Sequence, residues 1–329
     1  ESRIRGGHSF FRVRAGDAPI SAISEPLDFL LALNRETIDL HRKELRQNGV
    51  VIFDPSKIPN LSGENLFGVP LENLAETAGN KVMANTVALG AALGLVDYDR
   101  EILNQVLRES FHGKDGSVGE ANVKAAAAGY DYAQKNFEGK ILFHLKPISD
   151  VKRMLLSGTD AIALGAIAAG CKFLAGYPMT PTTPIIEYLA SKAREYGLVV
   201  VQPEDEISAI NMVVGAAYTG VRAMTATSGS GFCLMVEGIC LAGITETPAV
   251  VVLGQRPGPA VGLPTRISQE ELEFAIHVGS GEFPRAVLAP ATIEEHFWLT
   301  VKAFNLAEKY QILVILLTDH HLATSYATV

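Results

Sequence analysis

Two short segments of this chain carry residue types that are well suited to chemistry. Residues 177–184 read YPMTPTTP, and residues 204–212 read EDEISAINM. The three prolines of the first segment fix φ and remove backbone donors, so we expect neither a regular helix nor a central strand there. The threonines between these prolines therefore sit on a rigid backbone.

The second segment contains Glu206, which opens an apolar helix just after a predicted buried strand at residues 198–201. A carboxylate at the carboxyl end of a strand lies where α/β proteins build their ligand sites. One interpretation is that Glu204, Asp205 and Glu206 only complement the positive end of a helix dipole. The other is that Glu206 is partly buried, has a raised pKa and exchanges a proton with a ligand.

Two further loops follow predicted strands. Residues 225–231 (TATSGSG) form a strand that runs into small residues, where a ligand could approach backbone donors. This loop lacks the Gly-Lys-Ser/Thr of a Walker motif and the third glycine of a dinucleotide fingerprint. Arg256 lies in the sequence QRPGP at residues 255–259. A guanidinium there could bind a carboxylate through two hydrogen bonds, and an ordinary surface arginine is the alternative.

Other polar groups give weaker signals. His320 and His321 are adjacent, so on an extended chain their side chains point to opposite faces, and they are predicted to be structural or solvated rather than metal-binding. Residues 5–8 (RGGH) are predicted to form a turn that could touch an anion, and residues 113–116 (GKDG) a simple turn. No metal ligands are therefore predicted in this chain.

The elements expected around these groups alternate between strands and helices. The predicted strands span residues 198–202, 222–227, 249–253 and 312–318, all expected to be buried. The predicted helices span residues 159–170, capped by Ser157 or Thr159, then 207–218 and 232–241. The apolar face of the second helix is expected to contain Ile207, Ile210, Val214 and Tyr218. This alternation predicts an α/β fold with a doubly wound, mostly parallel sheet.

Before residues 146–150 the sequence alternates between glycine turns and short apolar runs, and after them it is strongly periodic. This change predicts two domains, 1–148 and 149–329. The first contains a predicted strand and turn at 49–55, and helices at 80–94 and 121–136. It is expected to be a smaller α/β domain.

Composition excludes several classes of protein. The chain has 329 residues, 48% of them hydrophobic, which is ample for a large core. A net charge of −8 without a basic stripe argues against nucleic acid, and no run of apolar residues is long enough for a membrane span. The cysteines Cys171, Cys233 and Cys240 form no CxxC pair and are predicted to be buried small hydrophobes. A cytoplasmic location is expected.

Several ordered motifs together resemble the 2-oxoacid:ferredoxin oxidoreductases. They are GYPMTP at 176–181, DE at 205–206, TATSG at 225–229, QRPGP at 255–259 and GLPT at 262–265. The resemblance is to the thiamine-pyrimidine domain of the α subunit and runs from about residue 158 to the end. The sequence IRGGHSFF at 4–11 and the helices after it resemble the γ domain, so the chain is similar to a fused γ–α subunit. Met179 stands where the family usually has isoleucine.

The resemblance implies roles for several residues. Glu206 is expected to pair with N1′ of the aminopyrimidine ring of thiamine diphosphate and to share a proton with it. Thr180 and Arg256 match positions that contact the oxo and carboxylate groups of the substrate. Cofactor contacts are also expected from Tyr177, Pro178, Thr227, Ser228 and Gly229.

The resemblance also implies partners. The expected reaction is the oxidative decarboxylation of 2-oxoacids, with coenzyme A taking the acyl group and ferredoxin the electrons. The sequence has no Gly-Asp-Gly motif with a later asparagine and no cysteine cluster, so Mg²⁺, the diphosphate site and the [4Fe-4S] cluster are expected in a β subunit. A fused γ–α chain favours 2-oxoglutarate or a broad range of 2-oxoacids. The sequence is also expected to be a fragment, or the ordered part, of a longer subunit.

Two alternatives remain open. One is another thiamine enzyme, of the transketolase or 2-oxoacid dehydrogenase type. The other is a non-catalytic assembly module that kept the fold, in which case replacing Glu206 would not affect turnover.

Overall fold

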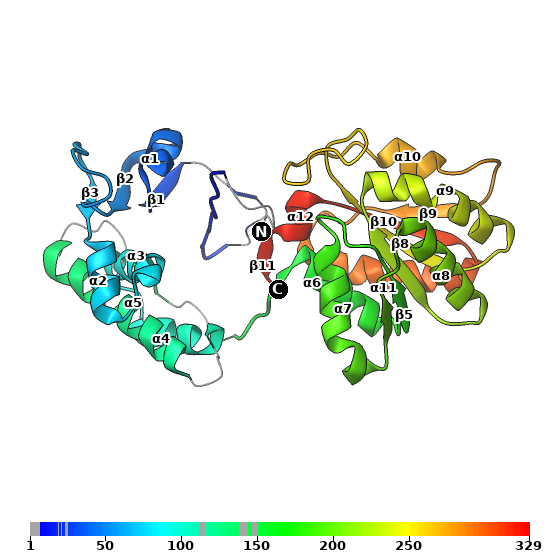
Figure 1. The fold of residues 1–329 in the computed structure, drawn as a ribbon, viewed down its shortest axis with the longest axis horizontal. Coiled ribbons are helices and arrows are strands. Elements are labelled where there is room, and N and C mark those ends of the chain that lie inside the picture. Colours follow the sequence, from blue (N-terminus) through cyan, green and yellow to red (C-terminus); the bar gives the residue numbers. More distant parts are fainter. Residues whose placement is uncertain are drawn as a thin grey trace. The chain divides into compact units, whose positions relative to one another are not determined.

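The computed structural model describes residues 7–18, 20, 22–23, 26–111, 116–137, 144–146 and 151–329. It separates into two compact units, which meet in the chain at Val151 and Lys152 (Figure 1). The segments 113–115 and 147–150, for which a turn and a domain boundary are predicted, lie outside the described residues.

The C-terminal unit contains a six-stranded parallel sheet covered by helices, and a separate pair of antiparallel strands formed by residues 155–157 and 326–328. Its strands are β4 (Leu155–Ser157), β5 (Phe173–Ala175), β6 (Val199–Val201), β7 (Ala223–Thr227), β8 (Ala249–Gln255), β9 (Arg285–Leu288), β10 (Leu313–Asp319) and β11 (Tyr326–Thr328). Its helices are α6 (Gly158–Ala168), α7 (Thr183–Tyr196), α8 (Glu206–Tyr218), α9 (Gly229–Ile244), α10 (Leu272–His277), α11 (Ile293–Tyr310) and α12 (His320–Thr324). The helices and strands predicted for this half are all present, with ends shifted by a few residues.

The six-stranded sheet has the order β6-β5-β7-β8-β10-β9, with every pair parallel. The chain moves outward from β5 to β6 and then back to β7 on the other side of β5, so the winding reverses between β5 and β7. The predicted doubly wound α/β fold is therefore confirmed. Folds of this kind bind ligands outside the carboxyl ends of the strands, at such a reversal.

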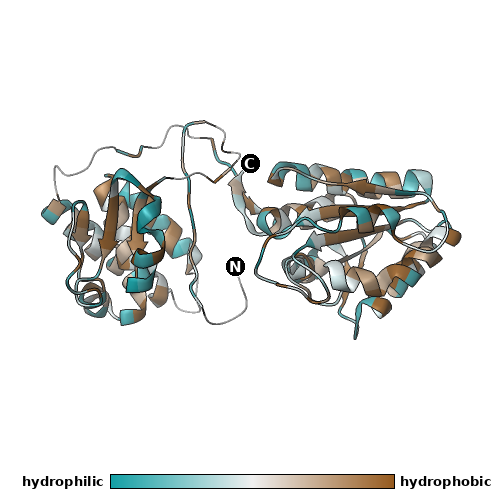
Figure 2. Cartoon of the chain, turned by 90° about the horizontal axis from the view of Figure 1, so that it is seen from above, coloured by the Kyte–Doolittle hydropathy of each residue, from teal (hydrophilic) through white to brown (hydrophobic). Residues whose placement is uncertain are grey.

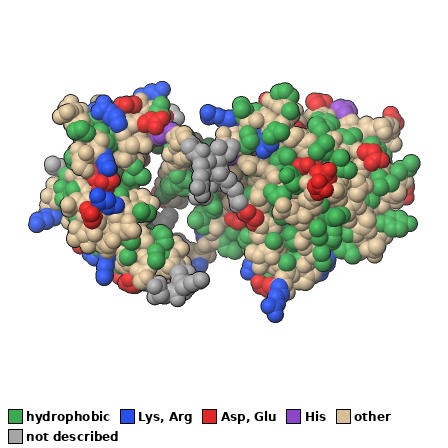
Figure 3. Space-filling model, in the orientation of Figure 1, with side chains coloured by type: hydrophobic (Ala, Val, Ile, Leu, Met, Phe, Trp, Pro, Cys, Tyr) green, Lys and Arg blue, Asp and Glu red, His purple; other side chains and the backbone are tan. Residues whose placement is uncertain are grey.

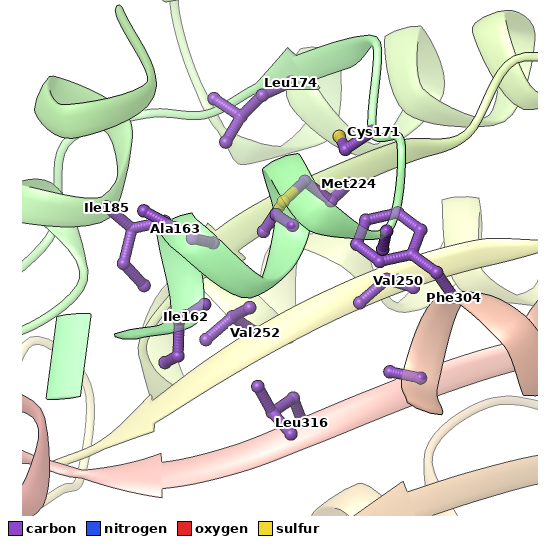
Figure 4. Packing of buried hydrophobic residues seen from close by; sticks show 14 of the residues in the cluster. Ile162, Ala163, Cys171, Leu174, Ile185, Met224, Val250, Val252, Phe304 and Leu316 are labelled. Carbon is purple, nitrogen blue, oxygen red and sulfur yellow. The ribbon is translucent and has the colours of Figure 1, made fainter. Parts of the chain in front are cut away.

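Both faces of this sheet are covered by helices. One buried cluster gathers residues of α6, α7 and α11 against the sheet, among them Ile162, Ile185 and Phe304, as Figure 4 shows. The opposite cluster gathers residues of α8, α9 and α10, such as Ile210 and Phe232. Because successive side chains of a strand point to opposite faces, residues of β8 alternate between the two clusters. Burying a side chain of this size stabilises the fold by roughly 1.5–3 kcal/mol.

Two predictions about buried surfaces are wrong. Strand β6, predicted to be buried, is an edge strand, and Val199 in it is 54% exposed. Helix α8 buries Ile210 and Val214 as predicted, but Ile207 is exposed and Tyr218 is 76% exposed. The helix is apolar almost all round, so its sequence pattern does not distinguish the true inner face, which instead includes Glu206.

The starts of α6 and α7 follow local chemistry. Ser157 caps α6 in a reciprocal capping box with Asp160, so Ser157, not Thr159, is the cap. The prediction that residues 177–184 contain no helix is wrong at its end. Helix α7 begins at Thr183 and contains Pro184 in its first turn, where the missing backbone donor is not needed.

The N-terminal unit is smaller. Its elements are β1 (Leu27–Ala32), α1 (Arg35–His41), η1 (Arg42–Glu44), β2 (Leu45–Phe53), β3 (Leu66–Gly68), α2 (Leu71–Ala78), η2 (Lys81–Met83), α3 (Ala84–Leu95), α4 (Arg100–Ser110) and α5 (Ser117–Phe137). The three strands form a parallel sheet in the order β1-β2-β3. Figure 2 shows hydrophobic residues along the strands of both units and a mixture of polar and hydrophobic residues on the helices.

Small residues determine how α3 and α5 pack in this unit. A side chain on Gly90 would collide with the backbone of Ala126, and one on Gly129 would collide with that of Val87. The two helices therefore touch backbone to backbone, as their small-residue composition allows. Of the predicted turn at residues 5–8, only Gly7 and His8 are described, and His8 Nε2 lies 3.0 Å from His41 Nε2.

The prediction for the cysteines is wrong in part. Cys171 is buried, but Cys233 is exposed and Cys240 is half-buried, because both lie on the outer side of the apolar helix α9. Among the described helices, none is long and apolar enough to cross a membrane.

Candidate active site

The carboxyl edge of the six-stranded sheet collects most of the candidate residues. The loop after β5 carries Thr180, the segment after β6 carries Glu206, and the loop after β7 carries Ser228 and Gly229. Arg256 follows β8 directly. Because these strands are parallel, segments far apart in the sequence emerge at one edge, on both sides of the point where the winding reverses.

Glu206 is buried at the start of α8. Asp205 is the N-cap, and its carboxylate accepts a hydrogen bond from the backbone N–H of Ser208 at 2.8 Å. Capping is thus performed by Asp205, while the Glu206 side chain is 3% exposed. Burial raises the pKa of the Glu206 carboxyl, and the neighbouring charge of Asp205 adds to the rise. Oε1 of Glu206 has no hydrogen-bond partner among the described residues.

The carboxyl of Glu206, whose Oε1 finds no partner in the described structure, lies against the first turn of α9. A Cβ atom on Gly231 would come within 2.5 Å of Glu206 Oε1 and would also strike the hydroxyl of Thr227. Only glycine leaves room for the carboxyl at this point. The sequence singled out this loop, but gave no sign that Gly231 and Glu206 would meet.

The amino end of α9 also has unused polar groups. Ser228 is its N-cap residue, yet the Ser228 side chain does not cap the helix. The hydroxyl is fully buried and finds no hydrogen-bond partner in the described part of the chain. A buried hydroxyl or carboxyl without a partner costs about 1–3 kcal/mol, so these groups point to a ligand that would satisfy them.

The proline–threonine loop is tied to this place by two contacts. The hydroxyl of Ser230, in the first turn of α9, donates to the sulfur of Met179 at 3.5 Å. Arg256 donates from Nη1 to the carbonyl oxygen of Thr180 at 2.7 Å. The loop therefore joins α9 to the exit of β8.

Arg256 is not an ordinary surface arginine. Its side chain is only 4% exposed, and burial lowers the pKa of the guanidinium while the charge of Glu271 opposes that effect. A guanidinium has five N–H donors, so the carbonyl of Thr180 does not exhaust them. A buried cation held in this way is suited to bind an anionic ligand.

Glu271 was missed by sequence reasoning. It precedes α10, and its backbone N–H donates to Oε1 of Gln255 at the end of β8, at 3.1 Å. The carboxyl lies so close to Gly229 that a side chain there would collide with it. Burial, with help from the charge of Glu270, raises the pKa of Glu271 to about 7. Nothing in the sequence marks this glutamate as buried, because acidic residues commonly begin helices.

The remaining candidates lie around this centre. Tyr177 and Pro178 are exposed, and Thr227 is buried beside Glu206. His320 and His321 begin α12 rather than a loop, and Nε2 of His320 is buried without a partner among the described atoms. Within the described ranges, no group of three His, Cys, Asp or Glu residues could hold a metal ion.

A doubly wound parallel sheet with buried, unsatisfied polar groups at its winding reversal defines an α/β ligand-binding domain. Residues 164–329 match the family model described as "pyruvate flavodoxin/ferredoxin oxidoreductase, thiamine diP-bdg", and residues 1–132 match "pyruvate ferredoxin/flavodoxin oxidoreductase". The chain belongs to the 2-oxoacid:ferredoxin oxidoreductase family.

Relatives and a solved structure agree with this assignment. The chain is 32% identical, over 100% of its length and 60% of the relative, to a 2-oxoacid:ferredoxin oxidoreductase subunit alpha of Sulfolobus sp.. Half of the chain is 48% identical to 44% of the 2-oxoglutarate synthase subunit KorA of Methanothermobacter marburgensis. The structure of 2-oxoglutarate:ferredoxin oxidoreductase from Magnetococcus marinus with 2-oxoglutarate, coenzyme A and succinyl-CoA bound matches with a TM-score of 0.87 and 34% identity, over 95% of this chain and 55% of that one. The chain thus spans about 60% of the length of its full-chain relatives.

Proposed function

We propose that this chain acts as an α-type subunit of a 2-oxoacid:ferredoxin oxidoreductase and supplies the aminopyrimidine side of a thiamine diphosphate site. The observation that carries the proposal is Glu206, a buried carboxyl with a raised pKa and an oxygen that has no partner in the described structure. An aminopyrimidine ring offers a ring nitrogen that can share a proton with such a carboxyl.

The residues around Glu206 fit this cofactor. Gly231 leaves space beside the carboxyl, and the unpartnered Ser228 hydroxyl and the uncapped first turn of α9 supply donors to a polar ring. Tyr177, Pro178, Thr227 and Gly229 are proposed to line the same site. Glu206 would hold the proton at the ring nitrogen. When bound, thiamine diphosphate supplies the nucleophilic carbon and the electron sink for decarboxylation.

The substrate side is proposed to be Arg256 and Thr180. Every 2-oxoacid has a carboxylate next to its carbonyl, and the planar fork of Arg256 suits a carboxylate better than a point charge does. The Thr180 hydroxyl would contact the oxo group. The names of the relatives and of the solved structure favour 2-oxoglutarate, or a range of 2-oxoacids that includes it.

A partner subunit is part of the proposal. The diphosphate site, Mg²⁺ and the [4Fe-4S] cluster would belong to a β subunit, with coenzyme A and ferredoxin as further partners and the cytoplasm as location. The outer side of α8 and α9 supports a partner, because it exposes Ile207, Tyr218, Leu234, Leu241 and Ile244. Figure 3 shows many hydrophobic side chains on the visible surface of this unit. Exposed apolar side chains that gather on neighbouring helices commonly mark a protein interface.

The N-terminal unit is proposed to be a γ-type domain. Its match to the family model at residues 1–132 and its parallel β1-β2-β3 sheet support that assignment. The domain limits proposed from the sequence, 1–148 and 149–329, fall within three residues of the division between the two compact units.

The test is reconstitution of the chain with a β-type partner and assay of 2-oxoacid-dependent ferredoxin reduction. Glu206→Gln should reduce turnover on the order of a hundredfold while assembly stays intact, because glutamine cannot hold the proton. Glu204→Gln, an exposed neighbour, is the matched control and should behave as the unchanged protein. Full turnover in assembled Glu206→Gln would favour a non-catalytic assembly module. Turnover that transfers two-carbon units without ferredoxin would favour a transketolase-type enzyme.

A further inference from the structure

The starting point is the second buried carboxyl at the amino end of α9. Glu206 and Glu271 flank this helix end, with Glu206 against Gly231 and Glu271 against Gly229. Glu271 is 8% exposed, and its Oε2 is buried with no hydrogen-bond partner in the part of the chain that the structure describes. The function proposed above uses Glu206 and leaves Glu271 without a role.

Glu271 is fixed in place from two sides. Its backbone N–H is held by the side chain of Gln255, the last residue of β8. Gln255 is followed directly by Arg256, whose charge acts on the Glu271 carboxyl. The carboxyl and the guanidinium therefore border the same end of β8, where the proposed substrate carboxylate would bind.

The charged neighbours of Glu271 act in opposite directions. Glu270, next to it in the chain, favours the protonated form, whereas Arg256 favours the ionised form. On the α9 side the titratable neighbour is Cys233, whose side chain is exposed but whose pKa is raised by partial desolvation of the thiol and by the charge of Glu271. Around Arg256, the titratable neighbour is His320, the first residue of α12, whose pKa is lowered by burial and also by the charge of Arg256.

An anion placed beside Arg256 would change this balance. It would neutralise the guanidinium and place a second negative charge near an ionised Glu271. A nearby negative charge disfavours the ionised form of a buried carboxyl. A protonated Glu271 removes the repulsion, and its O–H can donate from the oxygen that otherwise has no partner.

We propose that Glu271 takes up a proton when a carboxylate ligand binds beside Arg256 and so makes substrate binding depend on pH. This inference rests on the proposed function, because it takes the ligand of Arg256 to be the carboxylate of a 2-oxoacid. It adds a residue that recognises the charge of the substrate and a proton that accompanies binding.

The first experiment measures kcat and KM of the reconstituted complex from pH 6 to 9 with pyruvate and with 2-oxoglutarate. The KM should rise about tenfold for each pH unit above neutrality, since one proton accompanies binding, and kcat should change less. Glu271→Gln should give a KM that is flat with pH. Glu270→Gln should move the rise to lower pH, because removing its charge favours ionisation of Glu271. Glu273→Gln, an exposed glutamate of α10, is the control and should keep the original profile.

A second experiment does not depend on turnover. Oxamate, which carries a carboxylate beside an amide carbonyl, is bound to the same complex in a calorimeter at pH 8, in two buffers of different ionisation enthalpy. The unchanged complex should take up most of one proton, and Glu271→Gln should take up none.

The outcomes separate the two proposals. A KM that keeps its pH dependence in Glu271→Gln, or oxamate binding without proton uptake, would overturn the role of Glu271 even if the complex is fully active. A rise in KM that is equal at every pH in Glu271→Gln would also overturn it and leave only a structural role. Proton uptake through Glu271 in a complex that decarboxylates no 2-oxoacid would support the carboxylate site and reject the proposed function.

Discussion

Arg256 donates from Nη1 to the carbonyl oxygen of Thr180 at 2.7 Å, across 76 residues of sequence. The contact ties the exit of β8 to the loop after β5 and fixes the direction of a buried guanidinium. The carbonyl of Thr180 thus positions Arg256, a role separate from the ligand contact that is proposed for its hydroxyl.

Replacing Arg256 tests the guanidinium fork. Arg256→Lys keeps the charge but cannot hold the Thr180 carbonyl and a carboxylate with one planar group. In the reconstituted complex, kcat/KM for 2-oxoacids should fall. The loss should correspond to roughly 1–3 kcal/mol of transition-state stabilisation, and cofactor affinity should stay the same. Arg266→Lys, an exposed arginine of the following loop, is the control. Weaker cofactor binding with no change in substrate use would contradict the assignment.

Replacing Thr180 tests the hydroxyl separately. Thr180→Val keeps the backbone carbonyl that positions Arg256 and removes only the hydroxyl. The fall in kcat/KM should correspond to about 0.5–1.5 kcal/mol of transition-state stabilisation, which is the value of one neutral hydrogen bond. This loss should be smaller than the loss caused by Arg256→Lys. Steady-state kinetics with several 2-oxoacids measure it. An unchanged kcat/KM would leave Thr180 with the positioning role of its carbonyl alone.

Gly231→Ala tests the space beside Glu206. The added Cβ atom would lie within 2.5 Å of Glu206 Oε1, so the carboxyl must move. Turnover of the complex should fall on the order of a hundredfold, as for other small displacements of reacting groups. Gly215→Ala, on the exposed side of α8, is the control, because a Cβ there would meet no described atom within 4 Å. It should preserve turnover and stabilise α8 by about 0.5–1 kcal/mol.

The isolated chain should bind thiamine diphosphate weakly. The residues proposed for this chain contact the aminopyrimidine ring, while the diphosphate and Mg²⁺ sites are proposed to lie in the β subunit. Calorimetry of the chain with cofactor and Mg²⁺, with and without the partner, measures the difference. Tight binding of thiamine diphosphate in the absence of any partner would contradict the shared-site model.

Glu271 should also make stability depend on pH. Burial raises its pKa from 4.5 to about 7, so between these values the folded chain holds a proton that the unfolded chain has released. The free energy of unfolding should therefore fall as pH rises through this window, by at most about 1.4 kcal/mol per pH unit. Glu271→Gln should lose this slope, and thermal unfolding from pH 4.5 to 8 compares the two. A slope that persists in the variant would assign it to another group.

The sequence by itself determined the class of fold, and it singled out the segments that carry the candidate site. Alternating strands and helices predicted the parallel sheet, because period and turn residues are local properties of a chain. Glu206 and Arg256 could be singled out because each follows a predicted strand, and the carboxyl ends of parallel strands share one edge. The sequence did not show which face of α8 is buried, nor that β6 lies at an edge, because α8 is apolar almost all round and strand order depends on the path of the chain.

The tertiary structure alone decided which residues meet. Three features depend on segments that are far apart in the sequence. They are the burial of Glu271, the space that Gly231 leaves for Glu206, and the hydrogen bond from Arg256 to Thr180. No local pattern encodes such contacts, because the sequence around an acidic residue at the start of a helix is the same type of sequence whether that residue is solvated or buried. The raised pKa values follow from burial, and burial belongs to the packed sheet and helices rather than to any one segment.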